Sequence, residues 1–345
     1  MNGRQRINTV MRRGQPDRVP VWCLLSLEHI LRHGAPDGAL PQTIEELIAA
    51  ECSMTRHYHS DGLVIYLPGY PAGARVDDWI RSALGSVPVG DPSHMLDRAD
   101  PEQWEPDVAH YTAEQFYSSR LARETLGENY HIGGWTPDGF SSAIQWFPRL
   151  EEALVATIRD PARFQALVRY FDRVNAAWAR AQVMLGGLES IQISSPYSGS
   201  SFVSPALYRR MVLPSVQYLA NAIRDAGGFS YLHTCGFISD RLELMAETGV
   251  DGIECMDPPP LGDVTLAQAK ARVGDRLFLK GNLDSVNILL QGTDAQVDEA
   301  IRQTVLAGKP GGGFVLSSAC SVAPSVPPER IQRIWELAEE LGHYT

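Results

Sequence analysis

The sequence predicts an α/β fold, namely a single (β/α)8 barrel of the TIM type that takes in residues 1–345 as one domain. Strand-like runs alternate with amphipathic helical segments, and this alternation is typical of a parallel sheet with helices outside it. The runs number eight, which favours a closed barrel over an open sheet. No linker, internal repeat or low-complexity segment divides the chain.

The predicted strands are short, rich in Val, Ile, Leu or Phe, and bounded by Gly, Pro or Asp. They cover residues 19–25, 62–67, 130–133, 190–194, 229–232, 252–255, 277–280 and 313–317. Only the stretch 68–129 departs from the alternation, since it holds Pro, Gly, Trp and Asp without a clear period. We interpret it as an insertion at the mouth of the barrel.

The predicted helices begin and end at recognisable signals. Thr43-Ile-Glu-Glu46 is a capping box that leads to about residue 59, and Asp160-Pro161 opens a long helix towards Leu185. Ser204-Pro205 opens the next helix, which contains Pro214 and ends at Gly227. Shorter helices are predicted near 238–248, 264–273, 294–307 and 327–341.

Composition and charge exclude several classes of protein. The formal net charge of −11 and the lack of a Lys/Arg run argue against a nucleic-acid partner. No apolar stretch approaches the roughly 18–20 residues that span a bilayer, and the N-terminus lacks the apolar core of a secretory signal. The cysteines, at positions 23, 52, 235, 255 and 320, form an odd and scattered set. We therefore expect a cytoplasmic protein with metal-bound or buried thiols.

A candidate metal site lies in the stretch His233-Thr-Cys235-Gly236, read together with Cys320. His233 and Cys235 follow the fifth predicted strand, and Cys320 follows the eighth. Because the carboxyl ends of barrel strands share one mouth, these residues can meet there although 85 positions separate Cys235 from Cys320. One imidazole and two thiolates suit zinc, and three protein ligands leave a position open for chemistry.

Other polar residues follow the predicted strands and are candidates for catalysis or substrate binding. Glu254 is a possible fourth ligand or general base, or else a carboxylate bonded to barrel backbone. We interpret its neighbour Cys255 as a simply buried thiol. The candidate substrate-binding residues are Gln192, Tyr197, His131, Trp135 and Asn282. Each has a plainer interpretation, because turns and ordinary loop packing use the same residue types.

The chain resembles the uroporphyrinogen decarboxylase superfamily, and most closely its zinc-dependent corrinoid methyltransferase branch. The resemblance is carried by the opening from Arg4 to Val21, by Phe202-Val-Ser-Pro-Ala-Leu-Tyr-Arg-Arg-Met, and by His-Thr-Cys-Gly at 233–236. The stretch Leu277-Phe-Leu-Lys-Gly-Asn282 is similar to the seventh strand of the family. The resemblance covers nearly the whole chain and is strongest from about residue 190 to residue 335.

The resemblance implies a (β/α)8 barrel with catalytic zinc on His233, Cys235 and Cys320. It also implies transfer of a methyl group between a small substrate and the cobalt of a corrinoid. A thiol at the zinc would lose its proton and attack methyl on cobalt, or zinc would activate a methyl ether, and the sequence leaves both open. The chain lacks the Asp-x-His-x-x-Gly motif that supplies a lower cobalt ligand, so a separate corrinoid protein must bring the cobalt.

Two rival functions stay open at this point. A decarboxylase of the same superfamily would bind its porphyrin through an Arg-rich segment after the first strand, but Cys23-Leu-Leu-Ser-Leu-Glu-His29 contains no Arg. The other rival is a non-catalytic barrel that binds zinc or substrate. We favour the methyltransferase, acting on a small-molecule methyl donor or acceptor, with a homodimer as a possible assembly.

Overall fold

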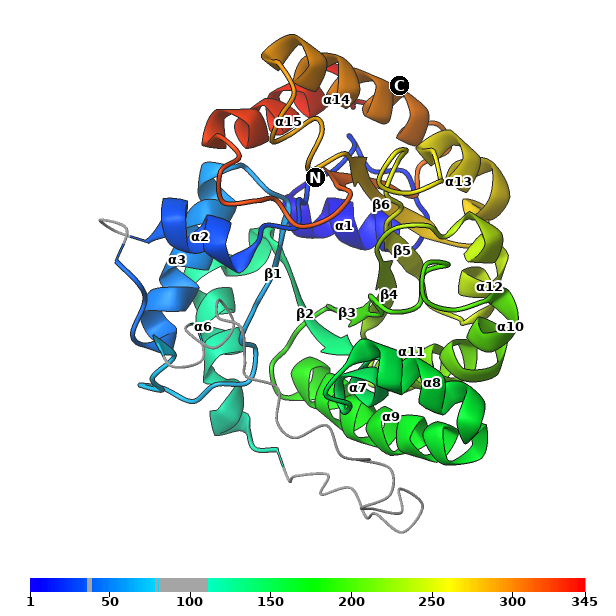
Figure 1. Cartoon of the computed structure of the whole chain (residues 1–345). Helices are drawn as coiled ribbons and strands as arrows, with labels where there is room; N and C mark the ends of the chain where they lie inside the picture. The colour runs from blue at the N-terminus through cyan, green and yellow to red at the C-terminus, as the bar shows by residue number, and fades with distance from the viewer. Residues whose placement is uncertain (36–38, 78–79, 81–110, 345) are drawn as a thin grey trace.

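The strands form one curled parallel sheet in the computed structural model, which describes residues 1–35, 39–77, 80 and 111–344. The sheet has seven strands in sequence order, and each neighbouring pair is parallel. These strands are β1 (Gly62–Val64), β2 (His131–Pro137), β3 (Ser190–Ser194), β4 (Phe229–Thr234), β5 (Gly252–Cys255), β6 (Phe278–Leu283) and β7 (Phe314–Ser318). Helices surround the sheet, which gives an α/β, TIM-barrel-like arrangement (Figure 1).

The predicted first strand, 19–25, is the one strand prediction that the structure does not bear out as a strand. This segment lies between β7 and β1 but pairs only through isolated bridges, Val21 with Leu316 and Leu25 with Val322. Pro20 has no N–H to donate to a ladder. The N–H of Val21 is bonded to the Asp61 carboxylate at 2.8 Å, not to a strand. The segment therefore bridges the two edge strands without forming an eighth regular strand.

The outer helices confirm the predicted alternation and add to it. The predicted ones are α3 (Ile44–His57), α9 (Pro161–Met184), α10 (Pro205–Leu207), η4 (Tyr208–Val212), α11 (Leu213–Asp225), η5 (Ser239–Arg241), α12 (Leu242–Glu247), α13 (Leu266–Val273), α14 (Asp294–Gly308) and α15 (Pro328–Leu341). Thr43 accepts the N–H of Glu46 and Asp160 accepts that of Arg163, so both side chains cap their helices. The predicted capping box at Thr43 is incomplete, because the Glu46 carboxylate accepts the N–H of Gln42 and not that of Thr43. In the described part of the chain, no helix is both long and apolar enough to cross a membrane.

Several helices were not anticipated from the sequence. They are α1 (Gly3–Met11), α2 (Leu27–Gly34), η2 (Ala113–Phe116), α6 (Tyr117–Leu126), η3 (Gly127–Asn129), α7 (Gly139–Gln145) and α8 (Leu150–Arg159). Helix α6 lies within the stretch 68–129 and packs on α3, and the interpretation of that stretch as an insertion stays a prediction. Residues 78–79 and 81–110 of that stretch lie outside the described residues.

Helix α1 covers the amino-terminal end of the ring of strands. It buries Ile7 and Val10 against Tyr231 and Phe278, which lie near the starts of β4 and β6. Figure 1 shows α1 lying across the ring of strands. This arrangement assigns the amino end to stability and the carboxyl end to function, as is usual for such barrels.

A buried carboxylate, Asp61, joins the bridging segment to the sheet. Its oxygens accept hydrogen bonds from Arg18 Nη1 at 2.7 Å, Arg6 Nη1 at 3.1 Å and the Val21 N–H at 2.8 Å. Its own N–H donates to the Val21 carbonyl at 2.7 Å. Asp61 and Arg18 are both nearly inaccessible to solvent. These contacts of Asp61 are structural and lie at the amino end of β1.

We expect Asp61→Ala to lower the free energy of unfolding by about 3 kcal/mol, because it removes one partner of a buried ion pair and the acceptor for Val21. Urea denaturation measures the change. The matched control is Asp294→Ala, whose ion pair with Arg330 is largely exposed on the aspartate side. We expect it to cost no more than about 1 kcal/mol. Equal losses for the two variants would contradict a structural role for Asp61.

Candidate metal centre and substrate cavity

Four soft donor groups meet at the carboxyl ends of β4, β5 and β7. The donor atoms of His233, Cys235, Cys255 and Cys320 all lie within 4.8 Å of one another. Cys235 Sγ lies 3.2 Å from His233 Nε2, 3.5 Å from Cys320 Sγ and 3.7 Å from Cys255 Sγ. The structure therefore brings together the three predicted ligands and adds Cys255 to them.

The parallel register places three polar side chains in one row across neighbouring strands. His233 in β4 pairs with Glu254 in β5, which pairs with Lys280 in β6. Residues paired in this way project to the same face of a sheet. Glu254 Oε1 forms an ion pair with Lys280 Nζ, and both side chains are fully buried. Glu254 Oε2 lies 3.4 Å from His233 Nδ1 and accepts a hydrogen bond from Gln192 Nε2.

The electrostatics of this row keep Glu254 ionised. Burial opposes ionisation, but Lys280 and His233 outweigh it, and the pKa of Glu254 falls to about 2. A carboxylate there can accept the proton of His233 Nδ1, which leaves Nε2 free to face the thiols. Glu254 is therefore placed behind the imidazole, and its two oxygens are already engaged by Lys280, Gln192 and His233.

The thiols differ in their surroundings. Cys255 is completely buried, whereas Cys235 and Cys320 are partly exposed. Hydrogen bonds from Cys235 and Cys255 lower the pKa of Cys320, while burial raises the pKa of Cys255. This contrast favours a thiolate at Cys320, which is the form that binds metals.

The backbone at the end of β5 adopts an uncommon conformation. Cys255 and Met256 have φ values of 78° and 53°, in the left-handed region that few non-glycine residues occupy. Strand β6 approaches closely at this point, since a Cβ on Gly281 would lie 2.7 Å from the Cys255 carbonyl oxygen. The left-handed backbone sets the direction of the Cys255 side chain at the end of β5. The close approach of the two strands explains why glycine occupies position 281.

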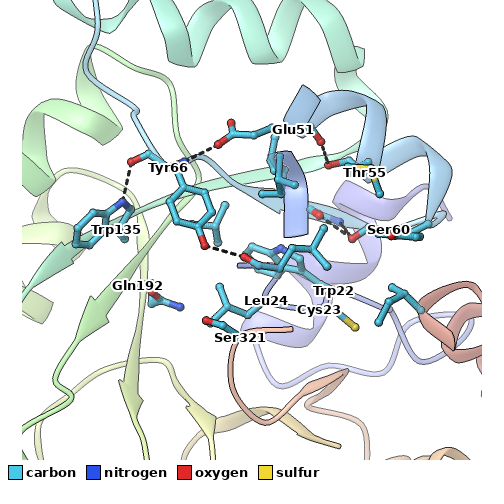
Figure 2. Close-up of a pocket in the computed structure, with 18 of the residues that line it drawn as sticks. Trp22, Cys23, Leu24, Glu51, Thr55, Ser60, Tyr66, Trp135, Gln192 and Ser321 are labelled. Carbon is cyan, nitrogen blue, oxygen red and sulfur yellow. Dashed lines mark hydrogen bonds between the residues drawn. The ribbon is translucent and has the colours of Figure 1, made fainter. Parts of the chain in front are cut away.

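A cavity of about 220 Å³ adjoins the cluster and includes His233 in its wall. It lies between the 19–25 segment, β1 and α3, and Figure 2 shows the rings of Trp22, Tyr66 and Trp135 around it, with Gln192 beside them. Two predicted substrate-binding residues, Gln192 and Trp135, thus line the cavity. Trp135 Nε1 donates to the Tyr66 carbonyl at 3.0 Å, which fixes the indole ring in place.

The other three candidate substrate-binding residues are placed elsewhere. His131 is fully buried at the start of β2, where it contacts Asn8 Oδ1 at 2.8 Å and Ser190 Oγ at 2.7 Å. Tyr197 packs edge-on against Phe202, and Asn282 donates to the Met256 carbonyl at 2.9 Å. None of these three is among the described residues that line the cavity. For His131 the reason is that β2 starts at the amino end, so the histidine lies at the opposite end of the strand from the mouth.

Lys280 and Cys255 are the two site residues that sequence reasoning missed or underrated. Lys280 carries a charge at the end of the otherwise apolar run Leu277-Phe-Leu, a pattern that indicates a buried ion pair. Lys280 Nζ also lies 4.9 Å from the Trp22 ring centre. Cys255 is the last residue of β5, and Cys235 directly follows β4. Unlike Cys235, Cys255 has no short spacing in the sequence that links it to His233.

Removing one member of the Lys280–Glu254 pair tests whether it is an ion pair in solution. We expect Lys280→Met to lower the free energy of unfolding by about 3–5 kcal/mol, because it leaves a buried carboxylate without its partner. The double variant Lys280→Met/Glu254→Gln removes both charges and should recover most of that loss. Urea denaturation measures both. A single variant as stable as the unchanged protein would contradict the ion pair.

His131 gives the protein a pH dependence that is separate from the metal centre. Burial lowers its pKa from 6.5 to about 4 in the folded state. Between these values the unfolded chain binds a proton that the folded chain does not, so the free energy of unfolding falls as the pH falls from 6.5 to 4. We expect His131→Gln to reduce this slope in urea denaturation at a series of pH values. An unchanged slope would show that His131 does not titrate in this way.

Comparisons with known proteins identify the family of the chain and agree with its fold. The family model described as "Uroporphyrinogen decarboxylase (URO-D)" matches residues 2–341. A methylcobamide:CoM methyltransferase from Methanosarcina acetivorans is 28% identical over 50% of this chain and 48% of its own length. The chain therefore aligns with about half of that relative. A uroporphyrinogen decarboxylase from Nocardioides sp. is 27% identical over 95% of this chain and 94% of its own length.

A solved structure described as a methyltransferase from Methanosarcina mazei has a similar fold. It superposes with a TM-score of 0.75 at 18% identity and covers 99% of both chains. At that identity the likeness concerns the fold alone. The family match, by contrast, extends over nearly every residue. The chain therefore belongs to the uroporphyrinogen decarboxylase family, whose members are enzymes that include methyltransferases and uroporphyrinogen decarboxylases.

Proposed function

We propose that this protein is a zinc-dependent methyltransferase that moves a methyl group between a small thiol or methyl ether and the cobalt of a separate corrinoid protein. The observation that carries the proposal is the cluster of His233, Cys235 and Cys320 beside a cavity that shares His233. The eightfold barrel, a cytoplasmic location and a homodimer stay predictions from the sequence.

The donor set fits zinc in chemistry and in size. A tetrahedral zinc with Zn–S bonds of about 2.3 Å separates its sulfur ligands by about 3.8 Å. The separations of Cys235 Sγ from Cys320 Sγ and Cys255 Sγ are 3.5 and 3.7 Å. Thiolate and imidazole are also the ligands that zinc prefers over the harder cations. We assign His233, Cys235 and Cys320 as the ligands that would hold it.

Whether Cys255 is a fourth zinc ligand matters most for the mechanism, because four protein ligands are typical of a structural zinc. Its thiolate would be completely desolvated, whereas those of Cys235 and Cys320 have some access to solvent. We propose that Cys255 stays a neutral neighbour and that the fourth position is open. A closed site on all four residues would instead support a non-catalytic zinc barrel.

Each residue of the site then has a role that its contacts support. Zinc, when bound, supplies a Lewis acid that favours deprotonation of a thiol or polarises the oxygen of a methyl ether. Glu254 orients His233 by accepting its Nδ1–H and so acts as a positioning residue, in place of the fourth ligand or general base that the sequence suggested. Lys280 holds Glu254 ionised, and Gln192 fixes its second oxygen. The aromatic and apolar wall of the cavity excludes water from the reacting groups.

A porphyrinogen decarboxylase is the second candidate, and the full-length match to a uroporphyrinogen decarboxylase favours it. Two features of the described residues weigh against it. A substrate of four linked pyrroles with acidic side chains exceeds a cavity of about 220 Å³, and no Lys or Arg is among the residues that line this cavity. The metal assay below separates the two candidates, because the decarboxylase needs no zinc.

We expect about one zinc per chain in the purified protein, measured by elemental analysis. We also expect methyl transfer from methylcobalamin to a thiol, measured as a change in the absorbance of the cobalamin. Cys320→Ser and His233→Ala should lose both zinc and activity, because each removes a ligand. The matched variant Cys255→Ser should keep its zinc. Loss of zinc in Cys255→Ser to the same degree would favour the closed site. Full activity in zinc-free protein would overturn the proposal.

A further inference from the structure

The cavity beside His233 is large enough for one small ring and little more. Its volume is about 220 Å³. For comparison, an engineered cavity of about 150 Å³ in another protein binds benzene. Since His233 belongs both to the wall and to the cluster, a ligand in the cavity lies directly beside the metal ligands. The size of the cavity therefore suits a molecule of about one ring with short substituents.

The wall of the cavity offers no charge to pair with an anion. No Lys or Arg is among the described residues that line it. Lys280 is buried below it and is engaged by Glu254. An anionic group moved from water into such a wall loses hydration without gaining a counter-charge. His233 is the one wall residue that could carry a positive charge, and it already faces Glu254 and Cys235.

The wall also lacks an ionised acid that would favour a cation. Its carboxyl group is that of Glu51 in α3, which is 1% exposed and accepts the Tyr66 N–H at 3.0 Å. Burial raises the pKa of Glu51 to about 8, so the group is mostly neutral at pH 7. Glu51 thus contributes to a wall without net charge.

The aromatic side chains present ring surfaces, not free polar groups. The Tyr66 hydroxyl donates to the Leu25 carbonyl at 2.8 Å, and the Tyr58 hydroxyl lies 2.8 Å from His29 Nε2. Trp135 Nε1 is also engaged, as described above. Figure 2 shows these bonds for Tyr66 and Trp135. With their polar atoms occupied, these side chains bind a ligand through apolar and aromatic contact.

We propose that the cavity binds a small uncharged substrate of about single-ring size, with its apolar body among Trp22, Tyr58, Tyr66 and Trp135 and its methyl-bearing atom towards His233. The identity of that atom rests on the proposed methyltransferase function, whereas the size and charge of the ligand rest on the cavity. An uncharged substrate of this kind would differ from coenzyme M, an anionic thiol on which relatives act.

Two pairs of probes with similar shape and different charge test this inference: 4-methoxyphenyl methyl sulfone with 4-methoxybenzenesulfonate, and 1-ethyl-4-methoxybenzene with 4-methoxybenzylammonium, beside methoxybenzene itself. Isothermal titration calorimetry measures their binding to the full chain, with and without zinc. We expect each neutral member of a pair to bind at least about tenfold more tightly than its charged counterpart, because an unpaired charge is costly to bury. Equal or tighter binding of the sulfonate or the ammonium would overturn the inference.

A pair of variants at Ser321 tests the reason for the selectivity. Ser321 lines the cavity and is exposed to solvent, so a longer side chain there should not disturb the core. We expect Ser321→Lys to bind the sulfonate about threefold more tightly than Ser321→Gln, which has similar length and no charge. No difference between them would overturn the role of the missing cation. Methoxybenzene that binds but is not demethylated would contradict the methyl-ether form of the proposed function and leave this inference standing.

Discussion

The buried ion pair between Lys280 and Glu254 is the interaction on which the arrangement of the site depends. It lies in the interior of the sheet, where an unpaired charge would be strongly destabilising. Because β4, β5 and β6 are in parallel register, the pair also fixes the height of His233 in the same row. One interaction thus stabilises the interior and orients the imidazole. A purely hydrophobic pair of similar volume could fill the space, but it could not accept the proton of His233.

The two ends of the ring of strands are built from different chemistry. At the amino end, α1 supplies apolar side chains and Asp61 forms ion pairs with Arg18 and Arg6 that do not reach the cavity. At the carboxyl end, three thiols and a histidine lie close together. This separation explains why the buried carboxylate of Asp61 stabilises the fold and takes no part in the site. It also explains why His131, only a few residues from Trp135, is on the structural side.

The sequence was sufficient to predict the alternation of strands and helices and the meeting of His233, Cys235 and Cys320. Those predictions depend on periodicity and on the shared direction of parallel strands, which are properties of the chain itself. The sequence could not show that Asp61 would take the N–H of Val21, and so the segment 19–25 was predicted as a strand. Likewise, Lys280 and Cys255 join the site through register between strands and a left-handed backbone, which no local pattern encodes.

His233 connects the cluster to the cavity, and this shared residue has a thermodynamic consequence. Its Nε2 lies 3.2 Å from Cys235 Sγ, while the residue also lines the space for the substrate. If the cluster holds zinc as proposed, a change in the orientation of the imidazole would alter the affinities for the metal and for the proposed substrate together. By linkage the coupling is reciprocal, so a ligand that packs against His233 also changes how tightly the metal is held.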